Sequence, residues 1–199
     1  MLLASTRHTR DAVARLWLSE GLPCAFRDCP GVYEDIRGWM SSRLDVHPKQ
    51  ITLVGSARTG YSLANFGKQF GEHSDLDFCV VSAELFGSFS RVFDAFSEDY
   101  RSGVVQPRNE RERMLWDENL RFGGRNIPQG FFDADKLPTF DRYPLAQRVG
   151  QTMWALKSKL EITPGAPRVR RASIRLYRDW RSFIERLTLN LRSVANGIQ

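Results

Sequence analysis

The sequence predicts an α/β fold in which a small mixed β-sheet is flanked by helices. Two short runs rich in apolar residues, at 51–54 and 75–81, have the length of strands buried in a sheet. Two longer stretches, 31–44 and 83–100, repeat their apolar residues at the spacing of helices that bury one face. Because such strands and helices alternate along the chain, helices are expected to cover the sheet.

In the first half of the chain we expect three helices and two strands. In chain order they are a helix at 9–20, a helix at 31–44, a strand at 50–54, a helix at 56–65 and a strand at 75–81. Gly21 and Pro23 end the first helix, and Pro48 precedes the first strand. The glycine-rich, polar stretch at 65–74 is predicted to be a loop.

The second half is predicted to be mainly helical. Its elements are helices at 83–100 and 108–120, a strand at 129–133, and helices at 144–160 and 169–195. Pro164, Gly165 and Pro167 separate the last two helices. We therefore expect two parts: a core of residues 1–140 that includes the N-terminal helices, and a C-terminal helical pair within 141–199 that packs on the core.

The composition is that of a soluble globular protein, with 42% hydrophobic and 26% charged residues. No stretch approaches the roughly 18 apolar residues of a membrane span. The first ten residues contain too short an apolar segment for a secretory signal. A cytoplasmic location without a membrane partner is the expectation.

The net charge is +6, and arginine supplies 24 of the 29 basic residues. Arginine suits bidentate recognition of phosphate or carboxylate, although a GC-rich genome would explain the bias equally well. The chain has three cysteines and three histidines, without a C-x-x-C pair. A zinc site or a disulfide framework is therefore not expected.

Two motifs carry the chemistry of this sequence. Asp75 and Asp77 lie two residues apart on a predicted strand, so their side chains point the same way, about 7 Å apart. Two carboxylates that close together favour a divalent cation between them. Gly55 permits a tight turn after the strand at 50–54, and Ser56 then starts a predicted helix, where anions are favoured. Together the motifs predict a site for a metal-bound nucleoside triphosphate.

These motifs resemble the signature of the DNA polymerase β-like nucleotidyltransferase superfamily. Val54-Gly55-Ser56 matches its hydrophobic-Gly-Gly/Ser element, and Asp75-Leu76-Asp77-Phe78 matches its Asp-hydrophobic-Asp/Glu-hydrophobic element. The resemblance covers residues 50–81, and beyond them only the order of elements agrees. The spacer between Ser56 and Asp75 is longer than is usual in the superfamily. A palm-like sheet is the fold that this resemblance implies.

The resemblance also implies a two-metal mechanism. Asp75 and Asp77 would hold two Mg²⁺ or Mn²⁺ ions, and Gly55 and Ser56 would bind the terminal phosphates of a nucleoside triphosphate. A third carboxylate usually completes the metal site, and Asp133 is the preferred candidate. Asp135 is the alternative. The expected activity is transfer of a nucleoside monophosphate from the triphosphate to a hydroxyl of an RNA end, a protein or a small molecule.

Three basic side chains are further candidates for contact with the nucleotide. Arg58 and Lys68 lie near the predicted phosphate site in sequence, although each is more simply explained as a surface residue. Lys157, on the helix at 144–160, is the third. In the superfamily a basic residue often reaches the nucleotide from a helix behind the sheet.

Two other functions remain open at this level. One is a catalytically inactive module of the same fold, which binds a nucleotide or a partner protein. The other is a nucleic-acid-binding protein, because Arg171, Arg175 and Arg178 would share one face of the helix at 169–195. The chain is too short for a large acceptor-binding domain, which favours a compact acceptor site, a partner chain or a homo-oligomer.

Overall fold

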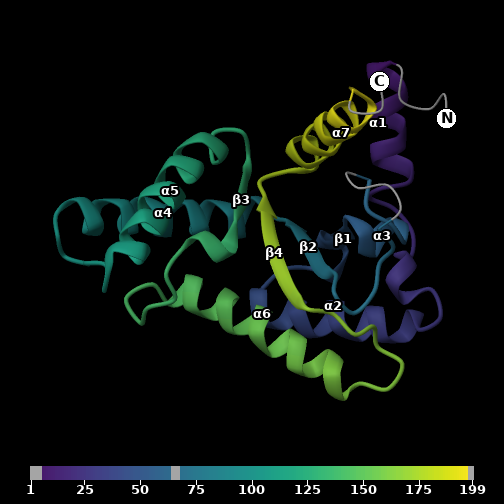
Figure 1. Cartoon of the computed structure of the whole chain (residues 1–199), viewed down its shortest axis with the longest axis horizontal. Helices are drawn as coiled ribbons and strands as arrows, with labels where there is room; N and C mark the ends of the chain where they lie inside the picture. Colours follow the sequence, from purple (N-terminus) through teal and green to yellow (C-terminus); the bar gives the residue numbers. More distant parts are fainter. Residues whose placement is uncertain (1–5, 64–67, 197–199) are drawn as a thin grey trace.

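The computed structural model describes residues 6–63 and 68–196, and in this part of the chain seven α-helices surround a four-stranded mixed sheet (Figure 1). The strands are β1 (Ile51–Val54), β2 (Asp75–Val81), β3 (Phe131–Asp133) and β4 (Arg171–Tyr177). The helices are α1 (Arg7–Leu16), α2 (Pro30–Leu44), α3 (Ser56–Thr59), α4 (Ala83–Arg101), α5 (Glu110–Asn126), α6 (Pro144–Ile162) and α7 (Trp180–Asn196). The predicted fold class, helices around a small mixed sheet, is confirmed.

The strands follow the order β1-β2-β4-β3 across the sheet. β1 is antiparallel to β2, β2 is parallel to β4, and β3 is antiparallel to β4. The register places Asp77 opposite Val54 on one side and opposite Ser173 on the other. Asp133 lies opposite Arg175. β4 therefore stands between the strand with the paired aspartates and the strand with Asp133.

The alternation of β2 divides its side chains between two cores. Leu76, Phe78 and Val80 are buried in the larger core, to which α2, α4, α5 and α6 contribute. Cys79 and Val81 belong to a smaller core on the other face, shared with α1 and α7. Asp75 and Asp77 have the same parity as these two residues, so they lie on the face that α1 and α7 cover.

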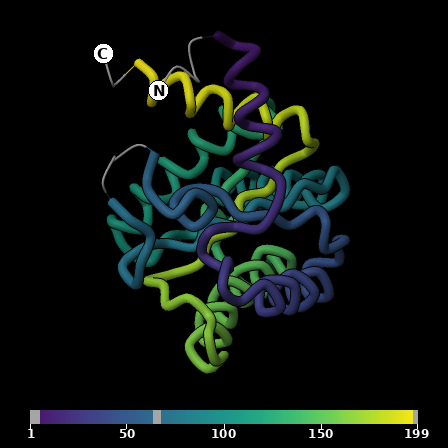
Figure 2. The backbone as a smooth tube through the Cα atoms, turned by 90° about the vertical axis from the view of Figure 1, so that its right-hand side faces the viewer, coloured from purple at the N-terminus to yellow at the C-terminus, as the bar shows by residue number. Residues whose placement is uncertain are grey.

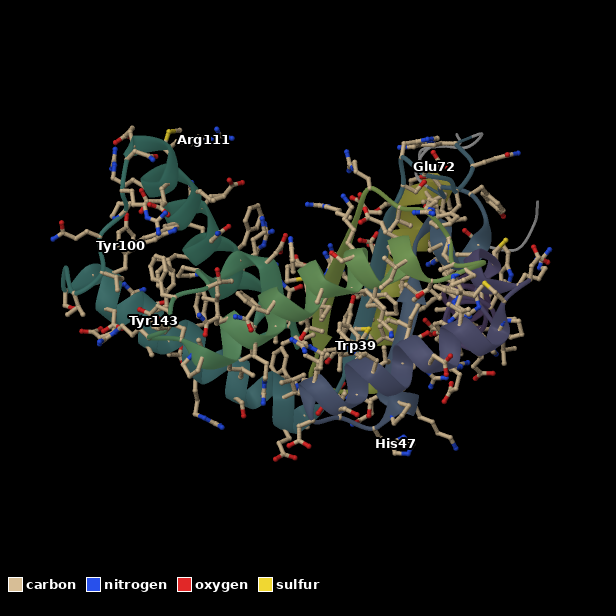
Figure 3. The ribbon with its side chains drawn as sticks, turned by 90° about the horizontal axis from the view of Figure 1, so that it is seen from below. Trp39, His47, Glu72, Tyr100, Arg111 and Tyr143 are labelled. Atoms are coloured by element: carbon tan, nitrogen blue, oxygen red, sulfur yellow. The ribbon has the colours of Figure 1, made fainter. Side chains whose placement is uncertain are left out.

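The helices that pack on the two faces of the sheet are visible in the figures. α2 and α6 run side by side beneath the sheet, with Trp39 of α2 between them (Figure 3). On the opposite face α1 crosses α7, which brings the first and last helices together (Figure 2). The Thr188 hydroxyl donates a 2.9 Å hydrogen bond to Asp11 and thereby joins these two helices.

The prediction of one helix over 169–195 is wrong, because its first part is the strand β4. Ala172, Ile174 and Leu176 alternate with Ser173 and Arg175, and this period of two fits a strand. Ile174 and Leu176 are buried in the larger core, so the segment gains a sheet position with partners on both sides. The expected C-terminal helical segment thus contributes a central strand as well as α6 and α7.

Most other predicted elements lie within a few residues of those observed, with two differences. α3 ends after four residues, because Gly60 takes a left-handed conformation with φ +86°. Residues 64 and 65 of the predicted helix, like 65–67 of the predicted loop, lie outside the described residues. α5 continues to Asn126 through Gly123, where a Cβ would lie 2.1 Å from the Phe93 ring. A glycine there lets α4 and α5 approach each other. Among the described helices none is both long and apolar enough to cross a membrane.

Candidate active site

The turn after β1 places Gly55 directly beside Asp77. Gly55 has φ +67° and ψ −152°, a backbone conformation that residues with a Cβ rarely adopt. A Cβ built on Gly55 would lie 3.5 Å from Oδ2 of Asp77. Gly55 of the Gly-Ser motif and Asp77, the second aspartate of the Asp-x-Asp motif, are 22 residues apart along the chain and therefore adjoin in space only through the fold.

These residues open into a pocket of about 440 Å³ between the sheet and α7. Residues of both motifs and of the neighbouring strands contribute to its polar lining, among them Gly55, Ser56, Asp77, Asp133, Ser173 and Arg175, and Asn190 and Ser193 of α7 add to it. Leu187 and Leu191 of α7 supply part of the apolar wall. A pocket of this volume, with apolar walls and a few converging polar groups, is typical of small-molecule sites.

Asp77 offers one free carboxylate oxygen to this pocket. Its Oδ1 accepts a 2.7 Å hydrogen bond from the Ser173 hydroxyl on β4. No hydrogen bond from any described residue reaches Oδ2, which is the oxygen beside Gly55. Ser173 thus fixes the orientation of the carboxylate while Oδ2 remains available to a ligand.

Asp75 has a different environment, although it points from the same face of β2. Arg170 donates from Nε to Oδ1 (2.9 Å) and from Nη2 to Oδ2 (3.0 Å). Arg171 donates from Nε to Oδ2, also at 3.0 Å. The hydrogen bonds from Arg170, and then the one from Arg171, hold the pKa of Asp75 below its ordinary value. Asp75 is not among the residues that line the pocket.

Asp133 lines the pocket but does not join the two aspartates of β2. Its carboxylate accepts a hydrogen bond from Nε of Arg175, and the whole width of β4 separates it from Asp77. Within residues 6–63 and 68–196, no three His, Cys, Asp or Glu side chains are grouped closely enough to hold a metal ion. The expected trio of Asp75, Asp77 and Asp133 is therefore not assembled in this structure. The alternative, Asp135, lies in the short 3-10 helix η3 (Ala134–Lys136) after β3.

Arg58 is a structural residue rather than a free phosphate ligand. Its side chain is 6% exposed and donates to the carbonyl oxygens of Leu53, Glu20 and Gly21 and to the Thr52 hydroxyl. These bonds join β1 to the segment that follows α1. Although Arg58 borders the pocket, its polar atoms are used for this purpose.

The other two basic candidates do not line the pocket. Lys157 projects from α6, which covers the opposite face of the sheet, and lies 3.7 Å from Glu161. Lys68 is exposed, and its carbonyl oxygen accepts a hydrogen bond from the Ser62 backbone N–H. Neither lysine is placed to contact a nucleotide in the pocket.

The sequence does not single out Ser173, and it singles out Arg175 only as part of a basic helical face. The predicted helix at 169–195 includes both residues, whereas β4 directs both into the pocket. The signal that could have revealed them is the strand-like alternation of residues 171–177. The predicted basic helical face does not form, because Arg171 and Arg175 lie on β4 and Arg178 precedes α7. Each of them also has an acidic partner: Asp75 for Arg171, Asp133 for Arg175 and Asp179 for Arg178.

The donor set fits one divalent cation of the Mg²⁺ type better than two. Mg²⁺ is commonly bound by one or two carboxylates, with substrate phosphates and waters as its other ligands. The free Oδ2 of Asp77, beside a turn that lacks a side chain, meets this requirement.

No family model, curated protein or solved structure matches the chain.

Proposed function

We propose that this protein is a metal-dependent nucleotidyltransferase that binds a nucleoside triphosphate in the pocket between the sheet and α7. It would transfer the nucleoside monophosphate to a hydroxyl group of an RNA end, a protein or a small molecule. The hydroxyl oxygen would form a bond to the α-phosphorus as the bond to the β-phosphate breaks, with release of pyrophosphate and of the hydroxyl proton to solvent. The observation that carries the proposal is the adjacency of Gly55 and Asp77. A backbone turn open to phosphate and a carboxylate open to a cation thus share one pocket.

The residues of the pocket have separate tasks in this proposal. Gly55 leaves room for a phosphate to approach the backbone, and the Ser56 hydroxyl is a hydrogen-bond donor in the same wall. The favourable field of a helix start adds little here, because α3 has only four residues. The apolar side chains of α7 can cover a nucleobase.

Asp77 is the residue that would hold the divalent cation. When bound, this cation would neutralise phosphate charge as a Lewis acid. Ser173 keeps the carboxylate in place through its bond to Oδ1. The acid is partly buried, and an electrostatic interaction with a charged ligand is stronger there than in bulk water.

The test is Mg²⁺-dependent transfer of labelled nucleoside monophosphate from each of the four triphosphates, with the protein itself and RNA oligonucleotides as acceptors. Wild type should label an acceptor, and Asp77→Asn should lose the activity. Asp94→Asn, an exposed position on α4, is the matched control and should keep it. Labelling by Asp77→Asn at the wild-type rate would refute the proposal.

A second candidate function is an inactive nucleotide-binding module of the same fold. It is favoured by one observation, the separation of Asp133 from the aspartates of β2. This function predicts that wild type binds the triphosphate with the same dependence on Asp77 but labels no acceptor. Equilibrium dialysis with labelled nucleotide, run beside the transfer assay, separates the two.

A further inference from the structure

The two aspartates of β2 have the same direction but not the same surroundings. Asp77 lines the pocket and keeps Oδ2 free of hydrogen bonds from the described residues. Both oxygens of Asp75 are occupied by three N–H donors from Arg170 and Arg171. A cation at Asp75 would have to displace charge-assisted hydrogen bonds, whereas a cation at Asp77 would displace none of these.

The arginine pair is fixed by the backbone as well as by Asp75. Arg171 lies directly opposite Asp75 in the parallel register of β2 and β4. The backbone N–H of Arg170 donates a 2.9 Å hydrogen bond to the carbonyl oxygen of Ser74, the residue before Asp75. The contacts with Asp75 therefore follow from strand pairing at this end of the sheet.

Much of each guanidinium remains available to a ligand. The side chains of Arg170 and Arg171 are 64% and 60% exposed, whereas that of Asp75 is 17% exposed. Asp75 takes Nε and Nη2 of Arg170 and only Nε of Arg171. The other N–H groups carry no hydrogen bond to the described residues, and a planar guanidinium matches phosphate oxygens well.

The position of the pair relative to the pocket suits a long polyphosphate. Asp75 and Asp77 lie about 7 Å apart on one face of β2, so the arginines flank the acid that faces the pocket. A triphosphate on the Gly55–Ser56 turn has terminal charges that can extend in this direction. A monophosphate would be too short to contact both the Gly55–Ser56 turn and the arginine pair.

We infer that Asp75 is a positioning residue that holds Arg170 and Arg171 as a phosphate-binding pair, and that Asp77 alone of the two aspartates holds the divalent cation. This inference rests on the proposed function and assigns its polyphosphate selectivity. It also gives different tasks to two acids that the sequence pattern treats as equivalent.

The test compares Asp75→Asn with Asp77→Asn, which are the same chemical change at two positions of one strand. Mn²⁺ binding is measured by electron paramagnetic resonance at ATP concentrations that saturate each variant, and binding of ATP and AMP without metal is measured by calorimetry. Asp77→Asn should weaken Mn²⁺ binding by about tenfold or more. Asp75→Asn should leave Mn²⁺ binding within about twofold while ATP binding falls about tenfold and AMP binding does not.

The double variant Arg170→Ala/Arg171→Ala tests the same assignment without altering either acid. It should reproduce the loss of ATP binding at unchanged Mn²⁺ affinity. A loss of Mn²⁺ binding in Asp75→Asn equal to that in Asp77→Asn would overturn the inference, as would undiminished ATP binding by the double variant. Failure of the wild type to bind any triphosphate would refute the proposed function itself, and this outcome is distinct from both.

Discussion

Gly55 and Asp77 meet where β1 ends, so closely that a Cβ on residue 55 would lie 3.5 Å from the free carboxylate oxygen. The antiparallel register, with Val54 opposite Asp77, produces this contact. The glycine is needed for two reasons: its backbone conformation is strained for other residues, and a side chain would occupy the space between turn and acid. Both reasons lead to the first prediction.

Gly55→Ala should lower the free energy of unfolding by about 2 kcal/mol, the cost of a residue with a Cβ in this backbone region. It should also abolish triphosphate binding, because the added methyl group faces Oδ2 of Asp77. Urea unfolding and calorimetry provide the two measurements. Gly38→Ala is the control: nothing lies within 4 Å of its Cβ position in α2, so it should stabilise by about 0.5–1 kcal/mol. Equal effects of the two substitutions would contradict the structural role given to Gly55.

Arg58→Lys should destabilise the fold by about 2–4 kcal/mol, because an ammonium cannot reach the four acceptors that the guanidinium contacts. The carbonyl groups of Glu20 and Gly21 would lose this donor, and with it the link between β1 and the segment after α1. Thermal and urea unfolding measure the loss. Arg111 is an exposed residue on α5, so Arg111→Lys should change stability by less than about 0.5 kcal/mol (Figure 3). A small effect at Arg58 would restore it as a candidate ligand.

Local pattern singles out the candidate residues at β1 and β2 that the structure brings together. Asp77 lies on β2, and Gly55 and Ser56 directly follow β1; both strands have clear apolar runs and pair with each other. The local pattern of β4 does not distinguish a strand from a helix, because Ile174, Tyr177 and Trp180 also have a three-residue spacing that fits a helix. The alternation of apolar and polar residues in this segment favours a strand only when β2 and β3 are available to pair with it.

The order of strands could not be obtained from the sequence either. The strand ending at Asp133 was predicted correctly, but a third carboxylate beside Asp77 would require β3 next to β2. β4 takes that place and brings Ser173 opposite Asp77. The ion pair of Asp75 with Arg170, 95 residues later, depends on the same long-range pairing and leaves no local signal.

Asp179 should make stability depend on pH in the acidic range. At the start of α7 its Oδ1 accepts hydrogen bonds from the backbone N–H (2.7 Å) and the hydroxyl (2.9 Å) of Ser182. The backbone bond, and then Arg178, lower the pKa of Asp179 to about 2. Because the folded pKa lies below the unfolded value of about 3.9, the stabilisation is present at neutral pH and is lost as the pH falls towards 2.

Asp179→Ala should therefore cost about 1 kcal/mol at pH 7, the usual contribution of a helix N-cap. The difference from wild type should shrink steadily below pH 4, which urea unfolding at a series of pH values would show. A difference that stays constant down to pH 2 would mean that the carboxylate charge is not responsible.

Cys79 should be the least reactive thiol of the folded protein. It is 1% exposed, and burial raises its pKa to about 12, so almost no thiolate forms at pH 8. Cys24 and Cys29 are half-buried and should react first with a disulfide reagent. Cys79 should follow only at the rate of unfolding, and its modification in native protein by peptide mass analysis would contradict its burial in the core beneath α7.

Asp133 and Arg175 provide the last prediction, because the structure gives this acid a partner other than a metal. Asp133→Asn should leave Mn²⁺ binding in the presence of ATP within about twofold of wild type, unlike a substitution at a metal ligand. It should reduce stability by about 1 kcal/mol, since Arg175 loses its charged partner in a half-buried site. The matched variant Arg175→Gln and the double variant complete a cycle, whose coupling energy should be near 1 kcal/mol if the two side chains act on each other. A tenfold loss of Mn²⁺ binding in Asp133→Asn would instead show that the strands rearrange around the cation and bring the third carboxylate to Asp77.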